Sequence, residues 1–351
     1  MKKSVKNIIY IVLLVALFVL SYVIDEKGSY MLVTVVRKGA VYALVAVSMN
    51  LLNGFTGLFS LGQAGFMLLG AYTYAIFTIP TAARESVYYY YEGGIINFQM
   101  NMILAMLLAG VVAAIFAYLI GLPVLKLKSD YLAIATLGFA EIVRAIAQWD
   151  GFGKITNGSN LLKKFTVLNN TTQYFLIVGI CIAVIALLIH STYGRAFKAI
   201  RDDEIAAQAM GINLARHKQL SFVISAFFAG IGGALLAIFQ TTVQANAFKS
   251  AMTYEILLIV VIGGIGSITG SILGSFLFIA CSEWWLRFLD EPMFIGTFQV
   301  PLLRTGFRMV VFSVIIMIVV LFFRRGIMGD KEFSLDRIAK LFKKKAKGDK
   351  K

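Results

Sequence analysis

The sequence predicts an all-α protein that crosses a membrane many times, with about ten transmembrane helices. Of its 351 residues, 59% are hydrophobic and only 15% are charged, whereas about a quarter of the residues in a soluble domain are charged. The apolar residues also form long runs, and no Asp, Glu, Lys, Arg or His occurs between residues 39 and 83. About 20 apolar residues cross the hydrocarbon core as a helix, so that run alone could cross twice. A transmembrane β-barrel would instead show short alternating segments.

The N-terminal segment is expected to be a membrane helix that stays on the protein. Three lysines among the first six residues precede an apolar run over 8–24, which is the arrangement of a secretory signal peptide. However, no A-x-A-like cleavage site precedes Asp25. We therefore expect residues 1–28 to form an uncleaved, signal-anchor-like helix.

Eight further apolar runs follow, and most have the length of one membrane crossing. They cover residues 39–53, 61–79, 101–121, 131–148, 173–190, 219–240, 254–286 and 306–323.

The run 254–286 is too long for one ordinary crossing, and the distribution of charge indicates how it divides. Lys and Arg gather in cytoplasmic loops. The loop 191–218 is basic and residues 324–351 hold eleven Lys and Arg, so both should be cytoplasmic and separated by an even number of crossings. The run therefore crosses twice and turns at the glycine-rich stretch 263–270. This gives ten helices with both termini cytoplasmic, and it assigns the net charge of +15 to loops and not to nucleic-acid binding.

A stretch rich in glycine and other small residues occupies positions 50–72. Two of its glycines should end one helix, and a serine is positioned to cap the next. Such residues allow another helix to pack closely. Alternatively, a broken helix lines a transport pathway here and presents its positive N-terminus to an anionic group. Both interpretations stay open for the candidate residues, which are Asn53, Gly54, Gly57, Ser60, Gly62, Gln63 and Gly65.

Two further features of the membrane runs are candidates for the pathway or for packing. Glu141 and Arg144 are spaced i, i+3 on one helix and can pair. The pair either faces the protein interior, as ionisable groups in a bilayer usually do, or Arg144 reaches the nearby membrane surface. The second glycine-rich turn and the first one, 54–62, are consistent with an inverted repeat. The candidate residues of the second turn, 263–270, are Gly263, Gly264 and Gly266.

The loop 191–218 contains the pattern of a short amphipathic helix. Asp202 can cap this helix, Asp203 and Glu204 are favourable in its positive first turn, and Gly211 supplies a left-handed stop. A helix of about eight residues is not stable alone in water. Its apolar face must be covered, either by the chain's own bundle or by a groove on a partner. That face comprises Ile205, Ala206, Ala209 and Met210, with Ala207 keeping the surface shallow.

These residues resemble the EAA-type coupling segment of ABC importer permeases, with Glu204, Ala206, Ala207 and Gly211 in matching places. The generic motif lacks a residue at Ile205 and continues with Leu-Pro, which is absent here. The pattern GRAxxAIRxDEIAAxxxGI, which includes Arg195, is instead similar to that of LivM-type permeases. The segments NGFTGLFSLGQAGF, SDYLAIATLGFAEIVR and VIGGIGSITGSILG resemble that family too, in the expected order.

The resemblance implies a membrane permease domain over 29–325, followed by a basic cytoplasmic tail over 326–351. It implies a bacterial plasma-membrane complex of this chain with a LivH-type permease, two cytoplasmic LivG/LivF-type ATPases and an extracytoplasmic substrate-binding protein. The implied substrates are Leu, Ile and Val, and the same family includes permeases for urea and short amides. The tail either lies as an amphipathic helix on anionic membrane lipid or is solvated and disordered.

The residues themselves predict a transport subunit and not an enzyme. The sequence has no G-x-x-x-x-G-K-[ST] phosphate loop, so ATP and Mg²⁺ should bind only to the partner ATPases and this chain should bind no cofactor. His190 and His217 are the only histidines, and Cys181 and Cys281 form no metal motif. A secondary transporter remains the alternative, and the coupling-type loop favours the ATP-driven importer.

Overall fold

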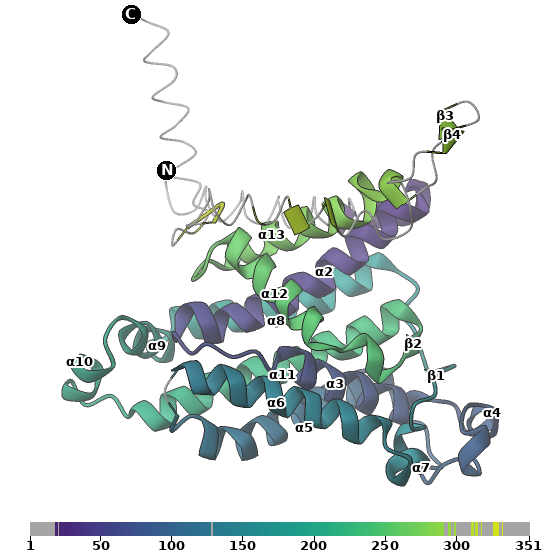
Figure 1. Ribbon diagram of the computed structural model, residues 1–351, viewed down its shortest axis with the longest axis horizontal. Helices are drawn as coiled ribbons and strands as arrows, with labels where there is room; N and C mark the ends of the chain where they lie inside the picture. The colour runs from purple at the N-terminus through teal and green to yellow at the C-terminus, as the bar shows by residue number, and fades with distance from the viewer. Residues whose placement is uncertain are drawn as a thin grey trace, which may run out of the picture.

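The computed structural model describes residues 18–19, 21–127 and 129–290, with short stretches beyond at 294–295, 298–299, 310–311, 313–314, 317, 326–329 and 332. This part of the chain is a bundle of helices that lie roughly along one direction (Figure 1). The long helices are α2 Tyr30–Asn50, α3 Gln63–Thr78, α5 Met102–Val124, α6 Ser129–Gln148, α8 Thr171–His190, α11 Leu214–Gln240, α12 Ser250–Gly263 and α13 Ile268–Ala280.

Short elements connect them. The helical ones are η1 Leu51–Phe55, η2 Thr81–Ala83, α4 Arg84–Val87, η3 Tyr89–Tyr91, η4 Asp150–Phe152, α7 Gly153–Thr156, α9 Thr192–Asp202, α10 Glu204–Ala209, η5 Ala245–Ala247, η6 Cys281–Trp285 and η7 Arg287–Asp290. The strands form two antiparallel pairs, β1 Leu162–Lys163 with β2 Thr242–Val243, and β3 Phe294–Ile295 with β4 Phe298–Gln299.

The polytopic all-α class is confirmed, but the described residues supply fewer crossings than the ten expected. Seven helices are long and apolar enough to span a membrane, or eight if α3 and the bent segment Thr81–Val87 count as one span. The difference has two sources. α3 has only 16 residues, about 24 Å of helix, which is shorter than the hydrocarbon core. The expected crossings 8–24 and 306–323 lie largely outside the described residues.

The run 254–286 divides as the charge pattern predicted. It forms two separate membrane-capable helices, Ala245–Gly263 and Ile268–Trp285. The break between them is made by glycines with positive φ, Gly264 at 125° and Gly266 at 86°, a region of backbone angles that favours glycine.

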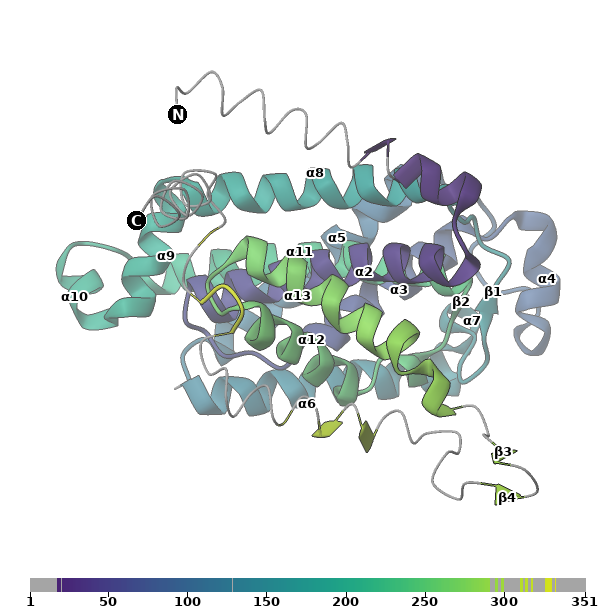
Figure 2. The same cartoon turned by 90° about the horizontal axis from the view of Figure 1, so that it is seen from above.

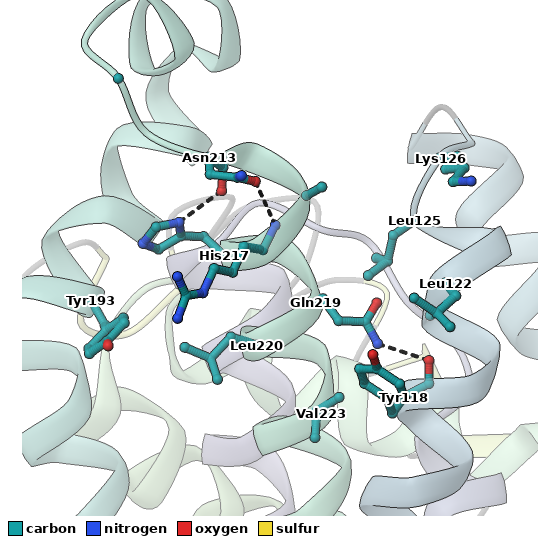
Figure 3. Close-up of a pocket in the computed structure, with 14 residues that line it drawn as sticks. Tyr118, Leu122, Leu125, Lys126, Tyr193, Asn213, His217, Gln219, Leu220 and Val223 are labelled. Carbon is teal, nitrogen blue, oxygen red and sulfur yellow. Dashed lines mark hydrogen bonds between the residues drawn. The ribbon is translucent and has the colours of Figure 1, made fainter.

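The connecting segments gather at two opposite ends of the bundle (Figure 1). One end, which we call the α4 end, carries α4, α7 and the β1–β2 pair. The other, the α9 end, carries α9 and α10. Loops that the sequence assigned to opposite sides of the membrane therefore lie at opposite ends. Seen from above, α8 and α6 lie on opposite sides of the bundle, with α2, α3 and α11 between them (Figure 2). A groove opens between α5 and α11 at the α9 end (Figure 3).

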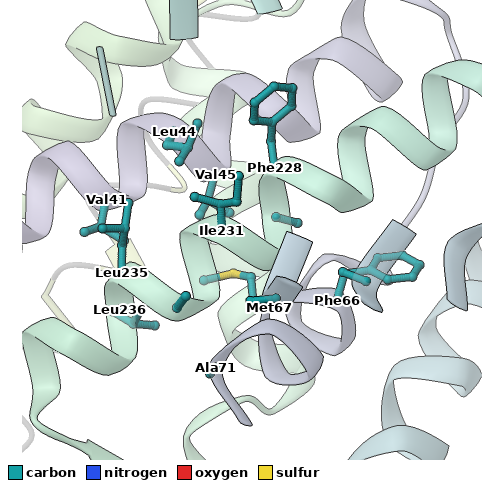
Figure 4. Packing of buried hydrophobic residues seen from close by; sticks show 14 of the residues in the cluster. Val41, Leu44, Val45, Phe66, Met67, Ala71, Phe228, Ile231, Leu235 and Leu236 are labelled. Carbon is teal, nitrogen blue, oxygen red and sulfur yellow. The ribbon is translucent and has the colours of Figure 1, made fainter. Parts of the chain in front are cut away.

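The core lies around α11, which packs on α2, α3 and α5 (Figure 4). Small residues make these approaches possible, as they do at membrane helix interfaces in general. A Cβ on Gly233 would lie 1.9 Å from the Met67 carbonyl oxygen of α3, and one on Gly230 would lie 2.7 Å from the Ala109 carbonyl oxygen of α5. The backbones of three helices are thus in near contact, and this fixes the position of α3 within the bundle.

Candidate coupling site

The predicted amphipathic helix is α10, and it follows α9 directly. Its cap is Asp203 and not Asp202, which corrects the sequence prediction. Asp203 has extended backbone (φ −159°, ψ 111°), and its carboxylate accepts hydrogen bonds from Ile205 N at 2.8 Å and Ala206 N at 3.0 Å. Asp202 is the last residue of α9, where its carboxylate instead pairs with Arg201 at 2.9 Å.

The tip of α10 exposes apolar side chains. Ile205 is 82% exposed and Met210 is 83% exposed, and Ala206 is exposed between them. Ala207 is buried against the chain itself, so it does not lie on this surface as the sequence analysis expected. Gly211 ends the helix with φ +83°, the left-handed conformation that the sequence predicted.

Two of the predicted coupling residues differ in their contacts. Glu204 pairs with Lys218 of α11 at 2.7 Å, which holds α10 against the start of that helix. Arg195 is exposed on α9 and forms no ion pair with any residue that the structure describes.

α9 contacts the first glycine-rich stretch through Arg201. Its guanidinium donates to the Gly54 carbonyl oxygen at 3.1 Å. Gly57 has φ +77°, and a Cβ there would lie 3.0 Å from the Arg201 Cγ. The Lys198 Nζ also lies 5.5 Å from the centre of the Phe55 ring. Gly54 and Phe55 belong to η1, a π-helical turn that continues α2, and Gly57 follows it. Such turns are frequent at functional sites.

The two glycine-rich stretches meet at Asn50, which is fully buried. Its Nδ2 donates to the Ser267 carbonyl oxygen at 3.0 Å and to the Ser271 Oγ at 2.7 Å. Its Oδ1 accepts from Gly266 N at 2.8 Å. A Cβ on Gly54 would lie only 1.8 Å from that oxygen, so the contact requires glycine. Sequence analysis missed both Asn50 and Arg201. The available signal was a lone amide at the end of an apolar run, since polar groups in membrane helices usually have a role.

α3 begins inside the bundle and not at its surface. Gln63 is 3% exposed, and its Nε2 donates to the Ser48 Oγ of α2 at 2.7 Å. The Ala64 N donates to the Thr253 Oγ1 of α12 at 3.1 Å. A Cβ on Gly65 would lie 2.7 Å from the Ala140 Cα of α6. The N-terminus of α3 is therefore surrounded by α2, α6 and α12. This arrangement is compatible with close helix packing and with a broken helix that lines a transport pathway.

The cap expected at Ser60 is different in the structure. The N-cap residue of α3 is Gly62, and no side chain caps the helix, because the chain runs two residues further before it turns helical. The Ser60 Oγ accepts from Gly62 N at 3.4 Å, and Ser60 N donates to the Asn53 Oδ1 at 3.3 Å. The Asn53 Nδ2 is buried with no hydrogen-bond partner among the described residues.

Glu141 and Arg144 pair on α6, with 2.7 Å between the Arg144 Nε and a Glu141 carboxylate oxygen. Glu141 also accepts a hydrogen bond from Ser250 at the start of α12. The Glu141 side chain is 36% exposed and the Arg144 side chain is 24% exposed, so the pair is only partly buried. It ties α6 to α12 near the α4 end and lies apart from the contacts of Asn50.

A bundle of membrane-capable helices, with the α9–α10 hairpin fixed to its first glycine-rich stretch through Arg201, defines a polytopic membrane protein. The family described as "Branched-chain amino acid transport system / permease component" matches residues 31–323, and the chain belongs to this family.

Several curated proteins are similar to it. The permease protein LivM of the high-affinity branched-chain amino acid transport system of Escherichia coli is 31% identical over 324 residues, covering 83% of this chain and 71% of LivM. A probable LivM of Methanocaldococcus jannaschii is 24% identical over 66% of this chain and 75% of its own length. LivH of Escherichia coli is 24% identical over 85% and 94%, respectively. No solved structure matches the chain.

Proposed function

We propose that this chain is a transmembrane subunit of an ATP-driven importer for branched-chain amino acids (Leu, Ile and Val). Its partners are a LivH-type permease in a heterodimer, two cytoplasmic LivG/LivF-type ATPases that bind ATP and Mg²⁺, and an extracytoplasmic substrate-binding protein. The complex lies in the bacterial plasma membrane, with both termini of this chain in the cytoplasm. Family membership supports the substrate class.

The observation that carries the ATP-driven mechanism is the exposed apolar tip of α10. Large apolar side chains such as Ile205 and Met210, more than four-fifths exposed, are stable in that position when a partner covers them, and helix-in-groove binding is a common way to do so. The hairpin formed by α9 and α10 is bonded to η1, which continues α2, through Arg201 and the Gly54 carbonyl oxygen. Movement of the ATPases would therefore pass through α9 to the turns that join α2, α12 and α13.

The test is leucine uptake by the complex reconstituted in vesicles with its ATPases and binding protein. Uptake should require ATP, survive a protonophore, and be competed by isoleucine and valine but not by urea. Ala206→Glu places a charge and extra volume in the α10 surface, where overpacking alone costs about 1–3 kcal/mol. It should abolish both copurification of the ATPases and uptake, at normal membrane levels.

The matched control is Ala82→Glu, which makes the same change at an exposed position of the α4 end and should leave both properties intact. If Ala206→Glu retains the ATPases and transport, α10 is not the docking element. If urea competes as well as isoleucine, the importer is right and the substrate class is wrong.

A further inference from the structure

The groove between α5 and α11 has no role in the function proposed above. It has a volume of about 840 Å³, which falls within the roughly 300–1,000 Å³ of small-molecule sites. It lies where the last turns of α5 meet the first turns of α11, with Tyr193 of α9 on its rim. Tyr118, Leu122 and Tyr193 are each about half exposed, so the groove opens onto the outer surface of the chain.

The two ends of the groove differ in chemistry. Asn213 and Lys126 lie at one end and Val223 and Tyr118 at the other (Figure 3). From Arg216 to Val223 the wall runs seven residues along α11, roughly 10 Å. The apolar side chains along the walls are Leu122, Leu125, Leu220 and Val223. A ligand that fills the groove must therefore have a polar head at the α9 end and an apolar part directed into the bundle.

The polar end carries positive charge, from Lys126 and Arg216, that no described residue of the groove neutralises. None of the described residues that line the groove is acidic, and neither Lys126 nor Arg216 forms an ion pair within the described part of the chain. Lys218, two residues further along α11, does pair, with Glu204. The N-terminus of α11 adds its own partial positive charge at the same end.

The His217 ring is also fixed at this end of the groove. Its Nδ1–H donates to the Asn213 carbonyl oxygen at 2.8 Å. The side chain of Asn213 accepts from Arg216 N at 3.0 Å and caps α11. The backbone that carries Arg216 is thereby held in place without using the charge of its guanidinium.

We propose that this groove binds an acidic phospholipid, with its phosphate at the polar end that Lys126 and Arg216 line and an acyl chain along the apolar wall. Basic pockets between transmembrane helices at the membrane edge bind anionic headgroups. A free anion would leave the apolar wall uncovered, and a zwitterionic lipid would bring its own cation against two uncompensated ones. The proposal uses neither the transported substrate nor ATPase coupling.

The test is lipid retention by the full-length chain, purified with its copurifying subunits from discs that contain equal phosphatidylglycerol and phosphatidylcholine, and measured by native mass spectrometry. Phosphatidylglycerol should be retained in preference. Lys126→Gln with Arg216→Gln should reduce that retention about 25-fold, since each basic group near a membrane surface contributes about fivefold. Val223→Trp, which fills the apolar end and keeps both charges, should reduce it as well.

The charge-matched control is Lys163→Gln with Lys249→Gln, which removes two exposed cations outside the groove and should retain the lipid. Inorganic phosphate at millimolar concentration should not displace it. Equal retention of the two lipids, or full retention by the Lys126/Arg216 variant in folded protein, would overturn the proposal. So would loss of phosphatidylglycerol whenever the ATPases are bound, because the groove would then be a protein interface.

Discussion

Asn50 is the residue through which the two glycine-rich turns contact each other. It lies at the end of α2, its side chain is fully buried, and it bonds to the turn between α12 and α13 more than 200 positions later in the sequence. A buried amide that lost these partners would leave several backbone groups unpaired, at about 1–3 kcal/mol each. The glycine at position 54 is what leaves room for it.

Gly54→Ala should therefore destabilise the protein. The added Cβ would lie 1.8 Å from the Asn50 Oδ1 and 2.5 Å from Gly266 N, so the bond between the turns must break or shift. We expect a loss of about 1–3 kcal/mol, the usual cost of overpacking, measured as a lower melting temperature of the purified complex. Gly138→Ala is the control, because its Cβ meets no atom within 4 Å and alanine favours helix by up to about 1 kcal/mol. Equal melting temperatures for the two variants would contradict this account of Gly54.

Sequence analysis located both glycine-rich turns but could not bring them together. Glycines are visible in a sequence because their spacing interrupts apolar runs. The pairing of Asn50 with the 264–267 turn depends on how distant helices pack, and no local pattern encodes that register. The same limit explains why Gly57 was identified and its neighbour Arg201 was not.

At the scale of elements, α9 contacts η1 directly, through the bond from Arg201 to the Gly54 carbonyl oxygen. α10 extends away from the bundle (Figure 1), with Ala207 as its buried contact. The loop thus has a part suited to binding and a part that connects to the membrane helices. The sequence predicted the short helix of the first part and its glycine stop at Gly211, since such stops are local signals. It misplaced the cap by one residue because either of two adjacent aspartates could serve.

Arg201→Gln should break the connection of the loop to the membrane helices and leave its binding part intact. The variant loses the charge-assisted bond to the Gly54 carbonyl oxygen, whereas the exposed face of α10 is unchanged. We expect the ATPases to copurify and hydrolyse ATP as before, while leucine uptake per ATP hydrolysed falls at least tenfold in reconstituted vesicles. Arg216→Gln removes the same charge at the same end of the bundle, from a side chain that forms no hydrogen bond or ion pair with η1 in the described part of the chain, and should keep the wild-type ratio. A wild-type ratio in Arg201→Gln would exclude this contact as the link.

At the scale of the whole molecule, ion pairs account for the residues that break the charge rule. Arg37 and Lys38 fall in a stretch that the ten-helix topology places outside the cell, where basic residues are disfavoured. Each has an acidic partner, Asp25 and Glu283 respectively. Burial raises the pKa of Asp25, but hydrogen bonds from Thr171 and Arg37 outweigh it and hold the pKa below its ordinary value. Asp25 is therefore charged at neutral pH and offsets the charge of Arg37.

The remaining Lys and Arg then support one orientation, with the α9 end in the cytoplasm and the α4 end outside.

Single cysteines test this orientation, after the native Cys181 and Cys281 are replaced by alanine. A cysteine at Asp202, whose side chain is 67% exposed, should react with a membrane-impermeant maleimide only in inverted vesicles. One at the exposed Asn160 should react only in intact cells or spheroplasts. A third at Lys347, which lies outside the described residues, should behave like Asp202, because an even number of crossings separates the two positions. Labelling of Asp202 and Asn160 from the same side would contradict the two-ended bundle, and opposite labelling of Asp202 and Lys347 would show that an odd number of crossings separates these two positions.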